Sequence, residues 1–551
     1  MKQRLCVLIA ILASVCLALG GNACAQHHHG DDQGAPPELL RTDLGSLHHP
    51  IATTSAEAQK FFDQGLTLVY AFNHGEAVRS FRRAAELDPK SPMPYWGIAL
   101  ALGPNYNETT PEDEKAPFEA IQKAQELAAN APDVERAYVA ALEKRFSNDA
   151  KPDYDKLARD YSAAMRVLSR EYPDDPDAAT LYAESLMDQH AWALWTNDGK
   201  PAENTLEIVS VLESVLRRWP EHCGANHFYI HALEMAPDPE RALPSAKRLE
   251  TLVPGAGHLV HMPSHIYMRT GDYAAAVKSN QDAIAVDKRL FARPGANVYM
   301  IYRSHNVHFL AAAAMMDGEY EVALDAAKDL ETRANAMVAE LPMAEAFLPW
   351  HYFVLLQFAR WDEILAIPVV TEKTNTMAFF SHYAHAMAFA AKGNIPEAES
   401  ERAAMEDVYK KIPPSSSMGM TYNNWQAVHE VAGHTLAARI AAARGKSPEA
   451  IAEWRAAVDA QDRMNYDEPA DWYYPVRESL GAALLASGDA AGAEKVFRED
   501  LERFNPRNPR SLFGLLKALE AQNKTVDADW VRTSFEAAWK GAPDSLRLAD
   551  F

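Results

Sequence analysis

The sequence predicts an all-α fold, a right-handed α-solenoid of roughly ten helix pairs with insertions between repeats. Three observations predict it. Ala-rich and Leu-rich segments with helical periodicity run from about residue 55 to the end, and strand-like alternation is almost absent. Similar residues recur at a spacing of about 34 positions. Of the 551 residues, 48% are hydrophobic and 24% are charged, which is typical of a globular chain.

The repeat is clearest near the two ends of the periodic region, where small, aromatic and proline residues keep the same order. In the first unit they are Phe61, Gly65, Leu68, Ala77, Phe81, Ala84 and Pro89. In the other they are Gly481, Leu484, Gly488, Ala493, Phe497, Leu501 and Pro506. Small residues let two antiparallel helices touch, and the proline ends the second helix. This pattern resembles the tetratricopeptide (TPR) repeat.

The repeats divide the chain into three regions. We expect N-terminal TPR-like repeats over residues 55–220, central His-rich TPR-like repeats over 221–412 and C-terminal TPR-like repeats over 413–551. The stretch Pro413–Ser417, of sequence PPSSS, is the best candidate for a linker between them.

The N-terminus has the features of an export signal. Two basic residues precede an uncharged run from Leu5 to Leu19, and Ala23-Cys24-Ala25 supplies a cleavage site. We therefore expect a signal peptide over residues 1–25, a disordered tail over 26–54 and a periplasmic or secreted protein. The alternative is a lipoprotein anchored through Cys24.

The net charge limits the class of partner, and the number of cysteines limits disulfide formation. The formal net charge is −22, which argues against nucleic acid because such partners require clustered basic residues. Removing Lys2 and Arg4 with the leader makes this charge two units more negative. Cleavage would leave Cys223 as the single thiol, so no internal disulfide can form. No later segment is apolar for long enough to predict a transmembrane helix.

Histidines are concentrated in the central region. Eight of the 20 lie between His222 and His308. The pair His227 and His231 recurs 34 residues later as His261 and His265, in the same repeat positions. A spacing of four places both side chains of a pair on one helix face. The resemblance to TPR proteins implies that these positions face the concave groove.

Imidazoles on neighbouring helices can converge on one metal ion, because packed helices lie about 8–10 Å apart. The primary ligands that the pattern predicts are His227, His231, His261 and His265, with a second tier of His258, His305 and His308. Imidazole suits zinc, copper, iron and nickel, and an exported protein favours copper or zinc, with iron as a further option.

Two nearby residues are candidates for catalysis. Glu234 shares the helix face of His227 and is a possible ligand or base, and Tyr267 lies close by in the sequence. An open metal position beside them would activate water or dioxygen. Pro263 interrupts the helix that carries the second pair, so either a helix starts there or the helix is kinked.

Two other motifs and two other functions compete with this interpretation. The segment from His429 to His434 resembles the zinc protease motif H-E-x-x-H, but its spacing of five turns the second ring about 140° away. The run Gln26-His27-His28-His29 would follow cleavage and could chelate metal weakly. The alternatives are a scaffold that holds a peptide, partner protein or small molecule in the groove without metal, and a metal carrier without turnover.

Four segments extend the resemblance beyond the repeat itself. They are HFYIHALE (His227–Glu234), GHLVHMPSHIYMRTGDY (Gly257–Tyr273), HNVHFL (His305–Leu310) and EPADWYYPVR (Glu468–Arg477). With them the chain resembles exported bacterial TPR proteins of a His-rich, poorly characterised group. The likeness covers most of residues 55–540 and implies a helical-repeat fold, but it transfers no reaction, because a fold hosts many functions.

Overall fold

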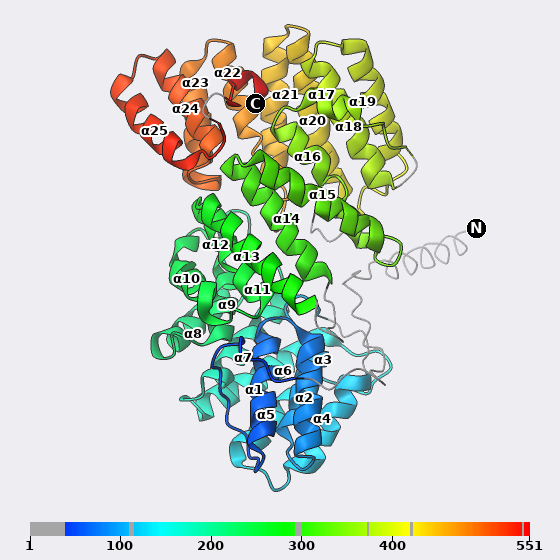
Figure 1. Cartoon of the computed structure of the whole chain (residues 1–551), viewed down its shortest axis with the longest axis vertical. Helices are drawn as coiled ribbons and strands as arrows, with labels where there is room; N and C mark the ends of the chain where they lie inside the picture. Colours follow the sequence, from blue (N-terminus) through cyan, green and yellow to red (C-terminus); the bar gives the residue numbers. More distant parts are fainter. Residues whose placement is uncertain (1–38, 110–114, 292–299, 372–373, 419–422, 543–544) are drawn as a thin grey trace, which may run out of the picture.

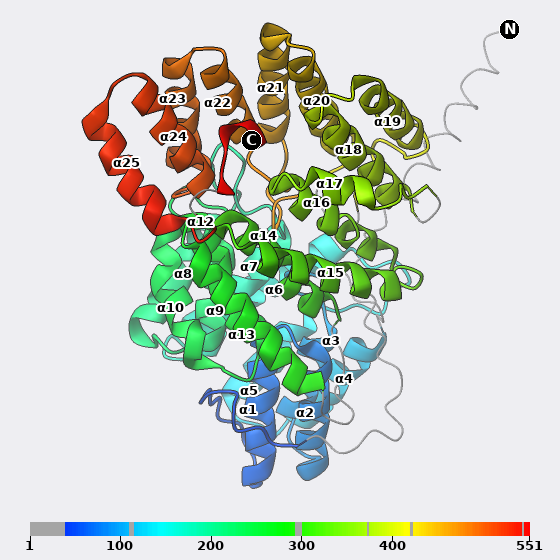
Figure 2. The same cartoon turned by 45° about the horizontal axis from the view of Figure 1, so that its top comes forward.

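The computed structural model describes residues 39–109, 115–291, 300–371, 374–418, 423–542 and 545–551 (Figures 1 and 2). These residues form α-helices joined by short connections, and within them β-structure is limited to two isolated bridges. The predicted all-α solenoid is thereby confirmed. The predicted leader and the run from Gln26 to His29 lie outside the described residues. None of the described helices is long and apolar enough to cross a membrane.

The helices fall into three groups along the chain. The first group contains α1 (Ala56–Tyr70), α2 (His74–Leu87), α3 (Met93–Leu102), α4 (Lys115–Ala128), α5 (Asp133–Glu143), α6 (Tyr154–Glu171), α7 (Pro176–Met187) and α8 (Thr205–Arg218). The second contains α9 (Cys223–Leu233), α10 (Leu243–Leu252), α11 (Gly257–His261), α12 (Pro263–Thr270), α13 (Tyr273–Phe291), α14 (Met300–Asp317), α15 (Tyr320–Met337), α16 (Trp350–Gln357) and α17 (Trp361–Ala366). The third contains α18 (Asn375–Ala391), α19 (Ile395–Tyr409), α20 (Trp425–Ala443), α21 (Ser447–Asp462), α22 (Arg477–Ala486), α23 (Ala490–Glu499), α24 (Pro509–Ala521) and α25 (Thr525–Ala538).

Consecutive helices pack as hairpins, as in α1 with α2, α14 with α15 and α20 with α21. Figure 1 shows the first helices at one end of the molecule, the helices from α8 to α14 in the middle, and the last repeats at the other end. Contacts between distant parts of the chain cover the middle from both sides, because α1 and α7 contact α9 while α14 contacts α24. The His-rich helices therefore lie in the interior.

The repeat pattern has a direct packing explanation. A Cβ atom added to Gly65 would lie 2.6 Å from Cε1 of Phe81, and one added to Gly481 would lie 2.5 Å from Cζ of Phe497. Both phenylalanines are fully buried. Only glycine lets the first helix of each pair approach the aromatic ring on the second, which is why the two residue types recur together.

The proline at 263 divides the helix that carries the second histidine pair. Helix α11 ends at His261, and α12 begins at Pro263 with the proline at its first position, where its missing N–H costs nothing. The N–H of Met262 donates to the carbonyl of His258 at 3.0 Å, so the backbone stays hydrogen-bonded up to the break. A new helix therefore starts at Pro263, and His258 and His261 lie on a short helix of their own.

Part of the segment predicted as a tail packs beside this short helix. The N–H of Gly255 donates to the carbonyl of Asp43 at 2.7 Å, and the Arg41 guanidinium donates to the carbonyl of Gly255 at 2.5 Å. Leu44 is buried. Residues that precede the first repeat therefore help to hold the turn before α11.

Candidate metal centre

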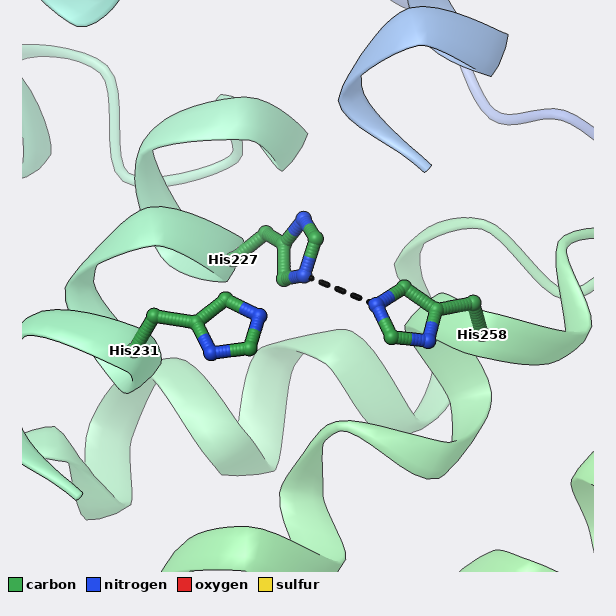
Figure 3. A group of neighbouring side chains, drawn as sticks. All are labelled: His227, His231 and His258. Atoms are coloured by element: carbon green, nitrogen blue, oxygen red, sulfur yellow. Dashed lines mark hydrogen bonds between the residues drawn. The ribbon is translucent and has the colours of Figure 1, made fainter. Parts of the chain in front are cut away.

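Six histidines form two neighbouring groups in the middle of the molecule. The first, drawn in Figure 3, consists of His227 and His231 on α9 and His258 on α11. The second consists of His261 on α11, His265 on α12 and His305 on α14. In each group one ligand atom per residue lies within 4.8 Å of the others. Each group is therefore close enough to hold a metal ion, since three imidazole nitrogens can share one ion at about 2.0–2.1 Å.

Hydrogen bonds orient the rings of the first group. Nδ1 of His227 donates to the carbonyl of Tyr70 at 2.7 Å, and Nδ1 of His231 donates to Oε1 of Glu234 at 2.8 Å. In a neutral imidazole this leaves the lone pair on Nε2. The Nε2 atom of His258 lies 3.1 Å from that of His227, and Figure 3 shows the rings approaching from opposite sides.

The second group is built in the same way. Nδ1 of His261 donates to Oδ1 of Asn280 at 2.7 Å, and the amide is held because its Nδ2 donates to the carbonyl of Ala276 at 2.8 Å. Nδ1 of His265 lies 2.5 Å from Oε2 of Glu234. The two Nε2 atoms then face one another at 2.8 Å. Acceptors behind a ligating histidine are typical of metal sites, where they fix the tautomer and the ring orientation.

Helix α14 contributes His305 to the second group, whereas its His308 belongs to neither group. The ring of His305 lies 4.8 Å from that of His261 and 5.7 Å from that of His265, measured between centroids. The ring of His308 packs instead against Trp350, with centroids 4.2 Å apart. His308, predicted in the second tier, lies outside both groups.

Both groups are enclosed by aromatic side chains. Of the six histidines, only His305 is more than 2% exposed. Phe72, just after α1, lies 4.6 Å from the His227 ring, and Phe309 lies 4.5 Å from the His265 ring. The resemblance to TPR proteins implies that these histidines face a concave groove. In the structure they are buried, because the N-terminal repeats fold over α9.

Burial keeps most of these imidazoles neutral. It lowers the pKa of His231 to about 3. Burial is also the main cause that lowers the pKa well below its ordinary value in His227, His258, His261 and His305. A neutral imidazole is the form that binds a metal, so these rings are ready to act as ligands at pH 7.

His265 is the exception. Burial acts to lower its pKa, but the carboxylates of Glu468 and Glu234 outweigh burial and raise the pKa to about 10. In the metal-free protein this ring is charged, and its Nε2–H donates to Nε2 of His261. A metal ion that binds the pair must replace that proton.

Glu468 reaches the centre from the far end of the sequence. It lies between α21 and α22, and its Oε2 atom is 3.1 Å from Nδ1 of His265. With His231 and Glu234 it forms a further buried group close enough to hold an ion. Burial, reinforced by the charge of Glu234, raises the pKa of Glu468 to about 7. Glu468 begins one of the segments that carry the resemblance, but it was not predicted as a ligand because no repeat spacing connects it to the histidine pairs.

The two catalytic candidates have different surroundings. Glu234 ends α9 and contacts both groups, with one oxygen on His231 and the other on His265. The hydroxyl of Tyr267 donates to Oε1 of Glu250 at 2.5 Å, so it is engaged with α10. Of the two, Glu234 is the residue that contacts the histidines.

The histidines of the motif that resembles a zinc protease signature bind different carboxylates. Nε2 of His429 lies 3.0 Å from the carboxylate of Glu406, and Nδ1 of His434 lies 2.7 Å from that of Glu453. Both histidines are on α20, where a spacing of five separates them around the helix, whereas Glu406 is on α19 and Glu453 is on α21. The motif therefore offers no shared ion position, as the spacing predicts.

A further group of ionisable residues, His49, Asp175 and Asp177, is satisfied by hydrogen bonds within the fold. Asp177 accepts from the Tyr70 hydroxyl at 2.7 Å and lies 2.8 Å from Nδ1 of His49 and 3.0 Å from Nε2 of His222. Asp175 caps α7. These contacts join the N-terminal segment to α7 and α9, so we attribute a structural role to them.

This network makes stability depend on pH. Burial acts to lower the pKa of His49, but Asp177 raises it above 6.5, so its contribution is complete below that value and is lost as pH rises through the raised pKa. The hydrogen bonds from His222 and His49 outweigh burial and lower the pKa of Asp177 below 3.8, so its contribution is lost only in strong acid. The pair therefore stabilises the fold most between these two ordinary values.

We expect His49→Ala to lower the free energy of unfolding by about 2 kcal/mol near about pH 5.5 and by clearly less near about pH 9. Urea unfolding of metal-free protein, followed by circular dichroism, measures both values. The matched control is His48→Ala, because the neighbouring His48 side chain is 60% exposed. An equal loss at both pH values would show that His49 acts through packing alone.

Comparison with known protein families finds no match for this chain, and none is found among curated proteins. Among solved structures, the human IFIT1 dimer with m7Gppp-AAAA is similar over 89% of this chain and 91% of that chain, at 13% sequence identity and a TM-score of 0.34. The chemistry of the site is therefore inferred from its own geometry.

Proposed function

We propose that this helical-repeat protein binds transition-metal ions through its buried histidine groups. One observation carries the proposal. Four of the rings have Nδ1 held by an acceptor, namely His227, His231, His261 and His265. Their Nε2 atoms point inward, where a metal would find oriented lone pairs on three of the rings and would replace one proton on His265. These four are also the primary ligands predicted from the sequence, and His258 and His305 complete the two groups.

The number of histidine ligands in each group favours a catalytic metal ion over a structural one. Three protein ligands leave a coordination position open for water or a substrate, as in catalytic zinc sites, whereas structural zinc is usually held by four. His305 is the partly exposed member of the six, so access to the open position lies on the α14 side. This supports activation of water or dioxygen at the metal.

Imidazole nitrogen is a suitable ligand for zinc, copper, iron and nickel. We favour copper or zinc, because imidazole is a borderline-soft ligand and the sequence predicts export. Burial argues against a rapidly exchanging metal carrier, since the ligands must be uncovered before the ion leaves. It also argues against a scaffold that binds peptides through an exposed histidine groove.

Metal analysis of protein purified without an added His tag tests the proposal. We expect about one metal or more per chain, and a loss of most of it in the double variant His261→Ala with His265→Ala. The matched control is His429→Ala with His434→Ala, which also removes two histidines and should leave the metal content unchanged. Less than about 0.2 metal per chain, unaffected by the first pair of substitutions, would reject metal binding.

Competition with a chelator distinguishes a tightly held metal ion from one that the protein only carries. Metal held in the buried groups should remain bound during a short exposure to a strong chelator and should be lost only on long incubation or partial unfolding. Release within the mixing time would instead identify a metal carrier.

A further inference from the structure

The two histidine groups lie against each other. Rings of different groups are as close as rings within a group: His231 and His265 have centroids 5.7 Å apart, as do His258 and His261. Within the first group the centroid distances run from 4.8 Å to 6.4 Å. The two groups therefore contact each other through two pairs of rings, His231 with His265 and His258 with His261.

One carboxylate serves both groups. Glu234 is 1% exposed; its Oε1 accepts from Nδ1 of His231 in the first group, and its Oε2 contacts Nδ1 of His265 in the second. Helix geometry explains the position, since Glu234 follows His231 by three residues and caps the end of α9 beside α12. Any movement of this carboxylate changes the orientation of one ring in each group.

Two buried carboxylates beside the groups would offset part of the charge of two cations. The six imidazoles contribute no negative charge, and a buried cation needs compensation. Glu234 and Glu468 are both buried, and Oε2 of Glu468 lies 3.1 Å from Nδ1 of His265. Two carboxylates therefore lie directly behind the ligand rings.

We propose that the two groups form one dinuclear metal centre, with one ion on each set of three histidines and Glu234 as a positioning residue common to both. This inference rests on the proposed function and extends it. Two adjacent ions, each with an open position, would share one small bridging ligand such as hydroxide.

Copper(II) titration, followed by removal of unbound ion and metal analysis, measures the number of sites. We expect about two ions per wild-type chain, about one in His258→Ala, about one in His305→Ala and none when both substitutions are combined. The electron paramagnetic resonance signal of the loaded wild type should integrate to fewer spins than the copper present, because neighbouring copper(II) ions couple. Each single variant should show the full signal of one isolated ion.

The wild-type measurements alone decide the outcome, so the test does not depend on the folding of any variant. A single ion per chain, or two ions with the full signal of isolated copper, would overturn the dinuclear centre and leave metal binding intact. No bound copper at all would reject the proposed function itself.

The role of Glu234 has a separate readout. We expect Glu234→Gln to weaken binding at both groups by about 10-fold to 100-fold, measured in the His258→Ala and His305→Ala backgrounds, where each group is titrated alone. Glu250→Gln is the matched control, because Glu250 accepts from Tyr267 and contacts neither group. An effect confined to one group would show that Glu234 is not common to both.

Discussion

Loading the wild-type protein with zinc is expected to raise its free energy of unfolding by about 4 kcal/mol per site when free zinc exceeds the Kd about 1,000-fold. An ion that binds the folded chain shifts the unfolding equilibrium by mass action, and the six ligands come together only in the folded state. Thermal unfolding with zinc and with excess chelator measures the shift. The variant with His258→Ala and His305→Ala should show none.

The metal-free protein supplies the control for this prediction. Nε2 of His231 and Nδ1 of His258 are buried and have no hydrogen-bond partner, which costs about 1–3 kcal/mol for each such atom. We therefore expect His258→Leu, without metal, to unfold at the same midpoint as the metal-free wild type or above it. A marked fall in that midpoint would indicate that the cluster is maintained for stability and not for binding.

The second large effect concerns the repeat packing. Gly481→Leu is expected to lower the free energy of unfolding by about 3 kcal/mol, because its Cβ atom alone would lie 2.5 Å from Cζ of Phe497. Urea unfolding of the variant measures the loss. Gly433→Leu is the matched control, since this helical glycine has no heavy atom within 4 Å of an added Cβ.

A double-mutant cycle shows whether the cause is contact with the ring. Phe497→Ala alone should cost about 3–5 kcal/mol by leaving a cavity. The combination with Gly481→Leu should cost less than the sum of the two, because leucine fills the space of the ring. Strict additivity would show that the glycine is required for backbone reasons and not for contact with Phe497.

The sequence predicted the fold because its signal is local and repeated. Gly65 and Phe81 lie within one hairpin, and Gly481 and Phe497 repeat the same spacing, so periodicity alone identifies two helices in contact. The break in the helix at Pro263 was also predictable from the sequence, although the choice between a helix start and a kink required the structure.

The candidate site was predictable only in part. The pairs at His227 and His261 follow the repeat, so their presence on neighbouring helices could be anticipated. Their division into two groups could not, because it depends on tertiary packing that brings His258 to His227 and His261 to His305. Asn280 and Glu468 act from outside the repeat pattern, and the contact between Glu468 and His265 arises from tertiary folding between distant segments.

The placement of Glu468 has a consequence for the order of assembly. The carboxylate beside His265 is supplied by a segment made long after the histidines during synthesis. A nascent chain that has folded through α14 carries all six imidazoles but not this negative charge. The full electrostatic environment of the centre therefore exists only once the C-terminal repeats have been made and have docked, which links completion of the ion site to completion of the molecule.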